Sequence, residues 1–349
     1  KEKYVDAVIG PQSYQSINQV IVDAEKTKIQ KDLTNFDVIE KFDELKINRN
    51  SNNKISSFLT IQEGCNKFCK FCVVPYTRGP EYSRDIKEIL READELIYNG
   101  SKEITLLGQN VNAYKNKNKR LSDIIFELAE KKDLKRIRYT TSHPKDMTDD
   151  LLEAHKKCKK LMPLLHLPIQ SGSDKILKSM NRKHNVKEYL QIIDKLKESN
   201  KKIKFSSDFI IAYPGESEKD FIKTCELVKN VKFINSYSFI FSARPGTPAG
   251  NMKTIDLNTA KKRLLIFQKI TDDLKFNYKK QLINQEVNAL FENKVNGKEN
   301  YYFGRDDFHN PVVVFSNKNI IGQEKKVIIR EITKQTVYGE LVKNKYLAA

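Results

Sequence analysis

Three cysteines that lie within eight residues constrain this chain more than any other feature of its sequence. The segment QEGCNKFCKFC contains Cys65, Cys69 and Cys72, whereas the whole chain of 349 residues has five cysteines. Cys158 and Cys225 lie in predicted helices, where a free cysteine is usually a small packing residue. An odd and sparse set of cysteines argues against a disulfide framework and indicates a reducing, cytoplasmic environment.

The spacing C-x3-C-x2-C favours an iron–sulfur cluster over the other sites that cysteines form. A structural zinc site requires four ligands, usually as two cysteine pairs. A thioredoxin-type motif needs two cysteines, which Cys69 and Cys72 would supply without Cys65. A [4Fe–4S] cluster is held by cysteine thiolates, and three protein ligands leave one iron open for a small molecule. We therefore expect Cys65, Cys69 and Cys72 to bind a [4Fe–4S] cluster.

The positive charge of the chain suggests a polyanionic partner. The formal net charge is +18, and 16 of these surplus positive charges lie in residues 58–282. Phosphate groups would give such a segment affinity for nucleic acid, although a composition rich in Lys, Asn and Ile is an alternative explanation. No apolar run approaches the roughly 18–20 residues of a membrane span, and the first residues lack a signal-peptide pattern. We expect a cytoplasmic protein without a membrane segment.

A regular alternation of strand and helix patterns begins at Phe58. Strands are predicted at 58–62, 103–108, 135–140, 164–170, 203–213 and 234–242, and a helical pattern follows each of them, ending with a long helix from about residue 258. Strands that alternate with helices imply a parallel sheet with right-handed crossovers. The predicted fold class is therefore α/β, a partial (β/α)6 barrel whose ligands gather where the strands end.

The chain divides into four predicted segments. Residues 1–42 carry a strand and a short helix, too little for a core, and suggest the end of a domain whose beginning is absent. Residues 43–56 have the polar composition of a linker. Residues 57–282 form the partial barrel, and residues 283–346 contain five short strands that suggest a small β-barrel of OB-like type.

The cysteine motif follows the first barrel strand and has Phe71 before its last cysteine, which resembles the signature of the radical S-adenosylmethionine (SAM) superfamily. The resemblance implies that the open iron binds SAM and that a reduced cluster splits it into methionine and a 5′-deoxyadenosyl radical. It also implies SAM contacts at other strand ends, by Gly108, Gln109, Gln170, Ser171, Arg182 and Asp208. A turn or a helix cap is the alternative for the loop residues.

Two further polar residues at or in strands remain open to more than one interpretation. Asp208 lies inside an apolar strand, where an unpaired carboxylate is costly, so it needs a partner that is either catalytic or structural. His143 ends the third strand and is either a functional residue or an ordinary loop residue. The sequence identifies no catalytic residue.

Longer motifs narrow the resemblance to one family within this superfamily. The segments LLGQNVNAY, RYTTSHP, HLPIQSGSDKILKSMNRKH, DFIIAYPGESEKDF and YSFIFSARPGTPAG resemble, in this order, the radical-SAM methylthiotransferases over essentially the whole chain. GQNVNAY and VVPYTRG look most like the branch that acts on tRNA. This implies an enzyme that methylthiolates C2 of N6-isopentenyladenosine (N6-dimethylallyladenosine) 37, next to the anticodon. Ala212 departs from the family, which usually has glycine there.

In that family a second, auxiliary [4Fe–4S] cluster supplies the sulfur and is bound by three cysteines of an N-terminal domain. The chain has no cysteines at equivalent places, so we expect a fragment of a longer enzyme, one that binds SAM and a single cluster without completing the reaction. The implied partners are the anticodon stem-loop of tRNA and an electron donor such as flavodoxin or ferredoxin. We expect a monomer.

The C-terminal barrel resembles the TRAM domain, an RNA-binding module. Aromatic residues mix there with Arg305 and His309, which suits stacking on unpaired bases. We therefore predict that Tyr301, Arg305 and His309 contact RNA, with an ordinary barrel core as the alternative.

Three other functions are consistent with the same motifs. One is the sister methylthiotransferase that modifies an aspartate of a ribosomal protein, and another is the tRNA branch that acts on threonylcarbamoyladenosine. A more remote alternative is a non-catalytic RNA-binding module with a structural zinc site, which would bind no SAM.

Overall fold

The computed structural model describes residues 5–10, 13–27, 31–33 and 54–342. Near the start, β1 (Ala7–Ile9) pairs in parallel with β2 (Lys31–Leu33), and α1 (Ile17–Thr27) lies between them in the chain. Most of the predicted linker, residues 43–53, lies outside the described residues. Of the helices that the structure describes, none is both long and apolar enough to span a membrane.

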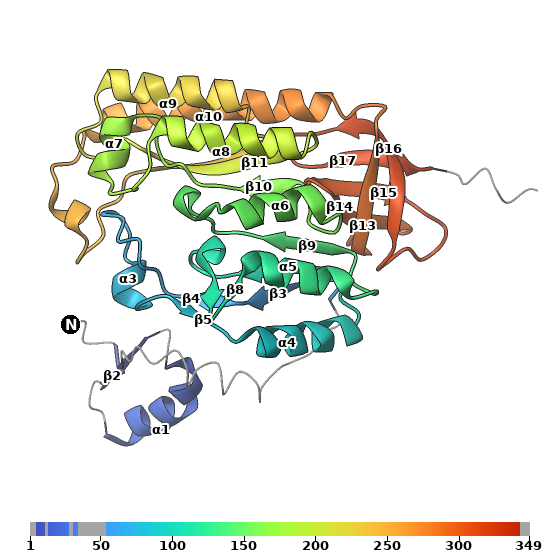
Figure 1. Cartoon of the computed structure of the whole chain (residues 1–349), viewed down its shortest axis with the longest axis horizontal. Coiled ribbons are helices and arrows are strands. Elements are labelled where there is room, and N and C mark those ends of the chain that lie inside the picture. Colours follow the sequence, from blue (N-terminus) through green and yellow to red (C-terminus); the bar gives the residue numbers. More distant parts are fainter. Residues whose placement is uncertain (1–4, 11–12, 28–30, 34–53, 343–349) are drawn as a thin grey trace, which may run out of the picture.

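Six parallel strands build the middle of the chain, as the alternating pattern predicted (Figure 1). One sheet contains β3 (Ser56–Thr60), β6 (Glu103–Leu107) and β9 (Arg136–Tyr139), and the second contains β10 (Leu164–His166), β11 (Lys204–Ile211) and β12 (Asn235–Ile240). A bridge between Ile137 and Leu161 joins the two sheets. Within the described residues β3 and β12 do not pair with each other, so the barrel is open along one side.

The fourth barrel strand is shorter than the apolar run that predicted it. The sequence predicted a strand over 164–170, but β10 ends at His166 because Pro168 has no N–H to donate to a sheet ladder. The chain still runs beside β11, since the N–H of Gln170 donates to the carbonyl of Asp208 at 3.0 Å. Gln170 has φ of +79°, which turns the chain away from the sheet at this point.

Helices cover the outer face of both sheets. They are α4 (Ile86–Tyr98), α5 (Leu121–Glu130), α6 (Asp149–Lys157), α7 (Asp174–Ser179), α8 (Val186–Ser199), α9 (Glu218–Val231) and α10 (Leu257–Lys280). Side chains satisfy the first free N–H groups of several helices: Asn185 and Glu188 form a capping box at α8, and Ser217 and Asp220 form another at α9. The boundaries agree with the helical patterns to within a few residues.

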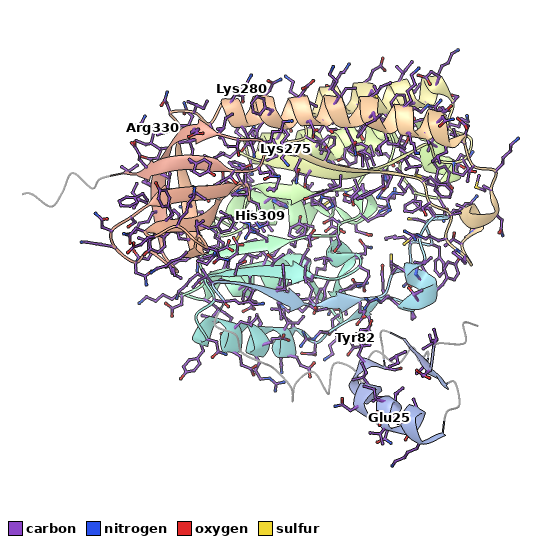
Figure 2. All side chains as sticks on the ribbon, turned by 180° about the vertical axis from the view of Figure 1, so that it is seen from behind. Glu25, Tyr82, Lys275, Lys280, His309 and Arg330 are labelled. Atoms are coloured by element: carbon purple, nitrogen blue, oxygen red, sulfur yellow. The ribbon has the colours of Figure 1, made fainter. Side chains whose placement is uncertain are left out.

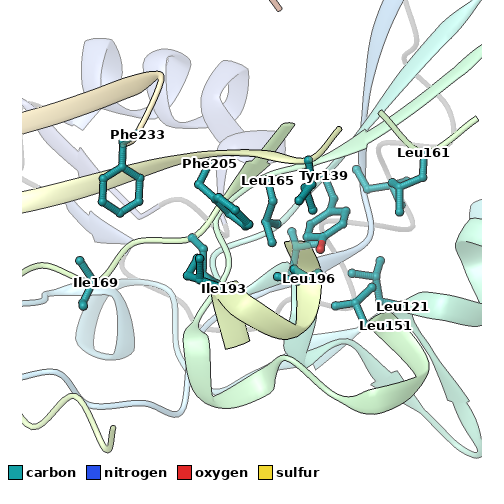
Figure 3. Packing of buried hydrophobic residues seen from close by; sticks show 14 of the residues in the cluster. Leu121, Tyr139, Leu151, Leu161, Leu165, Ile169, Ile193, Leu196, Phe205 and Phe233 are labelled. Atoms are coloured by element: carbon teal, nitrogen blue, oxygen red, sulfur yellow. The ribbon is translucent and has the colours of Figure 1, made fainter. Parts of the chain in front are cut away.

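The main hydrophobic core lies between the strands and these helices. Figure 3 shows Leu165 of β10 and Phe205 of β11 beside Ile193 and Leu196 of α8, all of them in this core. Because side chains alternate across a strand, the next residue on each strand faces the interior of the partial barrel instead. The interior face of the barrel is therefore available for ligands.

The C-terminal segment forms the closed five-stranded barrel that the short strand patterns predicted. It contains β13 (Glu286–Lys294), β14 (Tyr301–Asp306), β15 (Pro311–Phe315), β16 (Glu324–Ile332) and β17 (Val337–Leu341), in the spatial order β13-β14-β15-β17-β16. Its own core includes Phe291, Tyr302 and Val314. We refer to this unit as the small barrel.

Arg136 joins the partial barrel to the small barrel. Its side chain is fully buried on the interior face of β9. It donates to Oε1 of Glu324 at 2.6 Å and to the carbonyl oxygens of Arg305 at 2.9 Å and Asn288 at 3.2 Å. One buried side chain therefore holds three strands of the small barrel, β13, β14 and β16.

Arg138, two residues further along the same face, contacts the turn between β14 and β15. It donates to the carbonyl oxygens of Asp306 and Asp307, each at 3.0 Å, and to Oε2 of Glu103 at 2.9 Å. The small barrel thus closes the N-terminal end of the strands, opposite the end where ligands are expected. Figure 2 shows His309 at this junction, with Lys275, Lys280 and Arg330 toward the same end of the molecule.

Candidate iron–sulfur and SAM site

The three cysteines lie in one loop, between β4 (Gln62–Glu63) and α3 (Val74–Thr77), which we call the cysteine loop. Its first cysteine is tied to the segment that follows α3, since the N–H of Cys65 donates to the carbonyl of Gly79 at 3.2 Å. In its middle, the N–H of Lys70 donates to the carbonyl of Met180 at 3.0 Å, and the carbonyl of Lys70 accepts from the N–H of Ala249 at 2.9 Å. Segments more than 100 residues away in sequence therefore fix the position of the loop.

The chemistry of the three thiols fits an iron–sulfur cluster. Cys69 is buried, and Cys65 and Cys72 are half-buried. Cysteine thiolates are the donors that hold iron–sulfur clusters, and the three thiols share one loop. Burial raises the pKa of Cys65 to about 11 and also raises that of Cys72, so metal binding must release these protons.

Two glycines let the backbone approach closely beside the cysteine loop. Gly64 has φ of +74°, and a Cβ there would overlap the carbonyl of Pro80. A Cβ at Gly108, after β6, would lie 2.5 Å from Oε1 of Gln62. Gln109 reaches back to the loop, because its Oε1 accepts from the N–H of Gly64 at 2.7 Å. The end of β6 and the first cysteine are thus held together through Gly64.

Arg182 links the loop after α7 to the second cysteine. Its Nη1 lies 3.5 Å from Sγ of Cys69, and its Nη2 donates to the carbonyl of Pro168 at 2.6 Å. The side chain is buried, yet its Nε has no hydrogen-bond partner in the described part of the chain. A buried guanidinium N–H without a partner is costly, which makes this atom a candidate donor to a bound ligand.

Two buried histidines adjoin Arg182. His143 and His184 lie with ring centroids 5.6 Å apart, and neither Nε2 atom has a hydrogen-bond partner within the described residues. Nδ1 of His143 accepts from the N–H of Lys145 at 3.1 Å, so its Nε2 carries the proton when the ring is neutral. Burial, reinforced by Arg182, lowers the pKa of His143 and lowers that of His184 to about 4. Both rings are therefore neutral near pH 7.

His184 was not among the sequence candidates, although it lies two residues after Arg182 in the same motif. A lone histidine in a helix–loop segment gives no sequence signal of burial. Its burial and its contact with His143 come from the packing of two loops that are 41 residues apart.

The loop after β10 packs against α9. Ser171 is fully buried, and its Oγ lies 3.3 Å from Oγ1 of Thr224. A Cβ at Gly172 would lie 2.6 Å from the carbonyl oxygen of Lys223, which explains a glycine at this close approach. The hydroxyl of Ser171 therefore shapes the loop, and a SAM contact by Ser171 or Gln170 stays a prediction.

Asp208 has the partner that its place in an apolar strand required. Its Oδ2 lies 3.5 Å from Nε2 of His166, whose Nδ1 lies 3.0 Å from Oγ of Ser206. These side chains face the interior of the partial barrel, away from the hydrophobic core. The sequence did not single out His166, which stands in the motif HLPIQSG.

The predicted RNA contacts lie in two different places on the small barrel. Tyr301 is half-buried, packs edge to face on the exposed Phe315 at 5.6 Å, and has Nζ of Lys298 5.6 Å above its ring. Arg305 pairs with both carboxylate oxygens of Glu292 at 2.8 Å. His309 is exposed, in the turn that contacts the partial barrel. The RNA contacts of these three residues stay predictions.

Comparison with known proteins agrees with this geometry. Residues 59–228 match the Radical SAM superfamily model. The chain is 52% identical over 348 residues to the tRNA-2-methylthio-N(6)-dimethylallyladenosine synthase of Pelagibacter ubique, covering 99% of this chain and 78% of that protein. Proteins of the same name from Ruegeria (43% over 346 residues, 98% and 78%) and from a Wolbachia of Brugia malayi (46% over 317 residues, 89% and 72%) are also similar.

Proposed function

Because this chain belongs to the family of tRNA-2-methylthio-N(6)-dimethylallyladenosine synthases, we propose that it provides the radical-SAM part of that reaction, the methylthiolation of C2 of N6-dimethylallyladenosine in tRNA. The observation that carries the proposal is the cysteine loop beside Arg182 in an open (β/α)6 barrel. The family relationship favours this substrate over a ribosomal protein or a threonylcarbamoyladenosine.

The cluster and SAM belong at the C-terminal ends of the barrel strands. Cys65, Cys69 and Cys72 would hold the [4Fe–4S] cluster and leave one iron without a protein ligand. When bound, the cluster and SAM would supply the radical chemistry that removes a hydrogen atom from the substrate. The residues of this chain position the cofactor and exclude water.

SAM is bound by the strand ends around the cysteine loop. The close approach of Gly108 to Gln62 and the hydrogen bond from Gly64 to Gln109 hold the end of β6 beside the cysteine loop. Nε of Arg182 is a free donor for a carboxylate. The loop of Gln170 and Ser171 completes the site from the other sheet.

The small barrel is proposed as a TRAM-like RNA-binding unit. Tyr301, Phe315 and Lys298 place two aromatic rings and a cation together on its surface, which suits an unpaired base next to phosphate. Because Arg136 and Arg138 hydrogen-bond this unit to the partial barrel, an anticodon stem-loop held on it would lie beside the barrel. We further propose a monomer that takes electrons from a donor such as flavodoxin or ferredoxin.

Anaerobic reconstitution with iron and sulfide tests the radical-SAM assignment. The chain should bind about four irons per molecule and form 5′-deoxyadenosine from SAM under reducing conditions. Cys69→Ala should lose both properties, whereas the matched variant Cys158→Ala, whose thiol packs in the main core, should keep both. Bound zinc with intact SAM would contradict the proposal and support the non-catalytic metal module.

Methylthio transfer should not occur with this chain alone. Its five cysteines provide no second set of three thiolates. The auxiliary cluster, which supplies the sulfur in this family, therefore has no cysteine ligands in this chain. We expect 5′-deoxyadenosine without 2-methylthio product in the reconstituted chain. Mass spectrometry of digested tRNA separates the two outcomes.

A further inference from the structure

Two exposed aromatic side chains meet where the cysteine loop passes into α3. Phe68, the residue before Cys69, is 51% exposed, and Tyr76 on α3 is 45% exposed. Their rings meet edge to face, with centroids 6.2 Å apart and an angle of 79° between the ring planes. Neither side chain belongs to a hydrophobic core cluster of the described residues. We refer to Phe68 and Tyr76 as the aromatic pair, which presents flat apolar surface to solvent.

The backbone holds Phe68 in a conformation that packing does not explain. Its φ is +49°, in the left-handed region that is costly for a bulky side chain. The carbonyl of Phe68 accepts from Nδ2 of Asn181 at 2.8 Å, and two residues later the N–H of Lys70 donates to the carbonyl of Met180 at 3.0 Å. Strained residues that their surroundings hold in place are concentrated at functional sites. The exposed ring is therefore a candidate contact for a ligand.

Three loops that join beside the aromatic pair carry only positive charge. They are residues 66–80, 178–185 and 242–254, which contain eight Lys and Arg residues and no Asp or Glu. The backbone of Lys70 hydrogen-bonds the first loop to each of the other two. We refer to the three loops as the basic rim. Figure 1 shows α3 and α7, which adjoin the rim, at the end of the molecule opposite the small barrel.

Most of the charge on the basic rim is free to meet a partner. Three of the eight cations are engaged, Lys67 and Arg78 in ion pairs at 2.7 Å and Arg182 in the buried site beside Cys69. The other five are exposed and form no ion pair with another described residue: Lys70, Lys178, Lys183, Arg244 and Lys253. Five such cations without a neighbouring carboxylate in these loops attract a polyanion.

Rings and cations in this combination are typical of a surface that binds single-stranded nucleic acid. Proteins that bind single strands place positive charge along the phosphates and stack bases on aromatic side chains. An acidic protein would match the charge alone, whereas exposed ring faces match the faces of unpaired bases. A duplex keeps those faces inside its stack, so the matching partner is a loop of RNA.

We infer that the aromatic pair stacks on an unpaired base of the tRNA anticodon loop, beside the base that enters the barrel. This inference rests on the proposed function, and it adds an RNA contact at the cofactor end of the molecule. A target base that leaves the loop to reach an active site loses its stacking on its neighbours. A neighbouring base that stacks on Phe68 or Tyr76 offsets part of that loss. Because Phe68 directly precedes Cys69, the contact also places the loop next to the cluster.

Binding of two synthetic RNAs to the reconstituted chain tests the inference. One is the anticodon stem-loop, and the other is a duplex with the sequence of its stem and no unpaired bases. The wild-type chain should bind the stem-loop more tightly than the duplex. Tyr76→Ala and Phe68→Ala should each weaken stem-loop binding about tenfold, as expected for the loss of one stacked base, and should leave duplex binding unchanged. Tyr76→Phe, which keeps the ring, should retain most of the affinity.

Two controls show whether a loss of affinity is local. Tyr98→Ala removes a tyrosine that is 91% exposed at the end of α4, and it should leave both affinities unchanged. The iron content of each variant shows whether its cysteine loop is intact. If Phe68→Ala loses the cluster, Tyr76→Ala decides the matter, since Tyr76 lies outside the cysteine motif.

Three results would overturn the inference. They are equal binding of stem-loop and duplex by the wild-type chain, unchanged stem-loop affinity in Tyr76→Ala, and an equal loss of affinity for both RNAs in that variant. Unchanged affinity would leave the surface to an acidic protein partner such as the electron donor. Failure of the proposed function would show differently, as absence of 5′-deoxyadenosine in the wild-type chain without RNA.

Discussion

Nη1 of Arg182 lies 3.5 Å from Sγ of Cys69, although the two residues are 113 positions apart in the sequence. The guanidinium is held from the other side by the carbonyl of Pro168, and both Arg182 and Cys69 are buried. An N–H donor to a cluster-binding thiolate stabilises negative charge on the sulfur, and such contacts set the reduction potential of iron–sulfur clusters.

Replacing Arg182 should therefore lower the reduction potential of the bound cluster. The reduced cluster carries the additional negative charge, so it loses more stabilisation than the oxidised form when the donor is removed. We expect Arg182→Gln to lower the potential by about 60 mV, which is about tenfold in a one-electron equilibrium. A potentiometric titration monitored by electron paramagnetic resonance measures the reduction potential. Lys183→Gln, which removes an exposed charge on the next residue, should cause almost no shift, and equal shifts in both variants would contradict a direct N–H···S contact.

Truncation of Arg136 should loosen the small barrel. Arg136→Leu leaves Glu324 and the carbonyls of Arg305 and Asn288 without their donor in a buried junction. The carboxylate of Glu324 is 39% exposed and stays in contact with water, so the main cost is that of hydrogen-bond acceptors left without a donor, about 1–3 kcal/mol. We expect the free energy of unfolding to fall by this amount, and limited proteolysis to cut faster in residues 281–285, between α10 and β13.

A surface arginine of the small barrel provides the comparison. Arg330 pairs with Glu340 at 3.1 Å where both side chains are exposed. Such pairs contribute about 1 kcal/mol or less. If Arg330→Ala destabilised the protein as much as Arg136→Leu, the junction would not depend on burial of the Arg136 side chain.

Acid should weaken the fold through His155. Its Nε2 lies 2.6 Å from the hydroxyl of Tyr139 in the core, and burial lowers the pKa of His155 to about 4. Because the unfolded histidine titrates near pH 6.5, its contribution to stability is present above that pH and is lost as the pH falls through 4. We expect the free energy of unfolding to be about 2 kcal/mol lower at pH 5 than at pH 7 from this residue alone.

Urea unfolding at the two pH values measures this dependence. The double variant Tyr139→Phe/His155→Leu removes both polar partners and should reduce the difference between pH 5 and pH 7 by about 2 kcal/mol, leaving the part that the buried His143 and His184 contribute. Tyr139→Phe alone keeps the buried imidazole and should therefore keep the difference in stability between pH 5 and pH 7. A pH dependence that persists unchanged in the double variant would assign it to other buried groups.

Gly108 should tolerate no side chain. The Cβ of Gly108→Ala would lie 2.5 Å from Oε1 and 2.7 Å from the carbonyl oxygen of Gln62, and Oε1 also accepts from the N–H of Asn110 at 3.0 Å. Overpacking of this kind costs about 1–3 kcal/mol. We expect a matching loss of stability and weaker SAM binding in equilibrium dialysis. Gly297→Ala, in an open surface turn, should leave SAM affinity unchanged despite its positive φ.

Much of the fold was predictable because its signals are local. The period-two and period-3.6 patterns identified all six barrel strands and the five strands of the small barrel, and the cysteine motif identified its own loop. The clearest error concerns the end of a strand: the fourth strand stops four residues early, before a proline.

The candidate site was only partly predictable, since its contacts join distant segments. His184 and His166 gave no signal, because a histidine has the same local pattern whether it is buried, exposed or paired. Their roles depend on His143 and Asp208, which other strands bring to them. Phe68 and Tyr76 similarly gave no sign of their exposure until the fold showed that their rings meet at the surface.

By itself the sequence determined the cysteine motif, the order of strands and helices, and membership of a methylthiotransferase family, because these depend on residue identity and short-range periodicity. Tertiary structure decided that Arg182 meets Cys69, that Arg136 and Arg138 close one end of the barrel, and that Asp208 meets His166 in its interior. The physical reason is that burial and electrostatic pairing are properties of neighbours in space. Parallel strands place such neighbours side by side only after a crossover helix has returned the chain to the sheet.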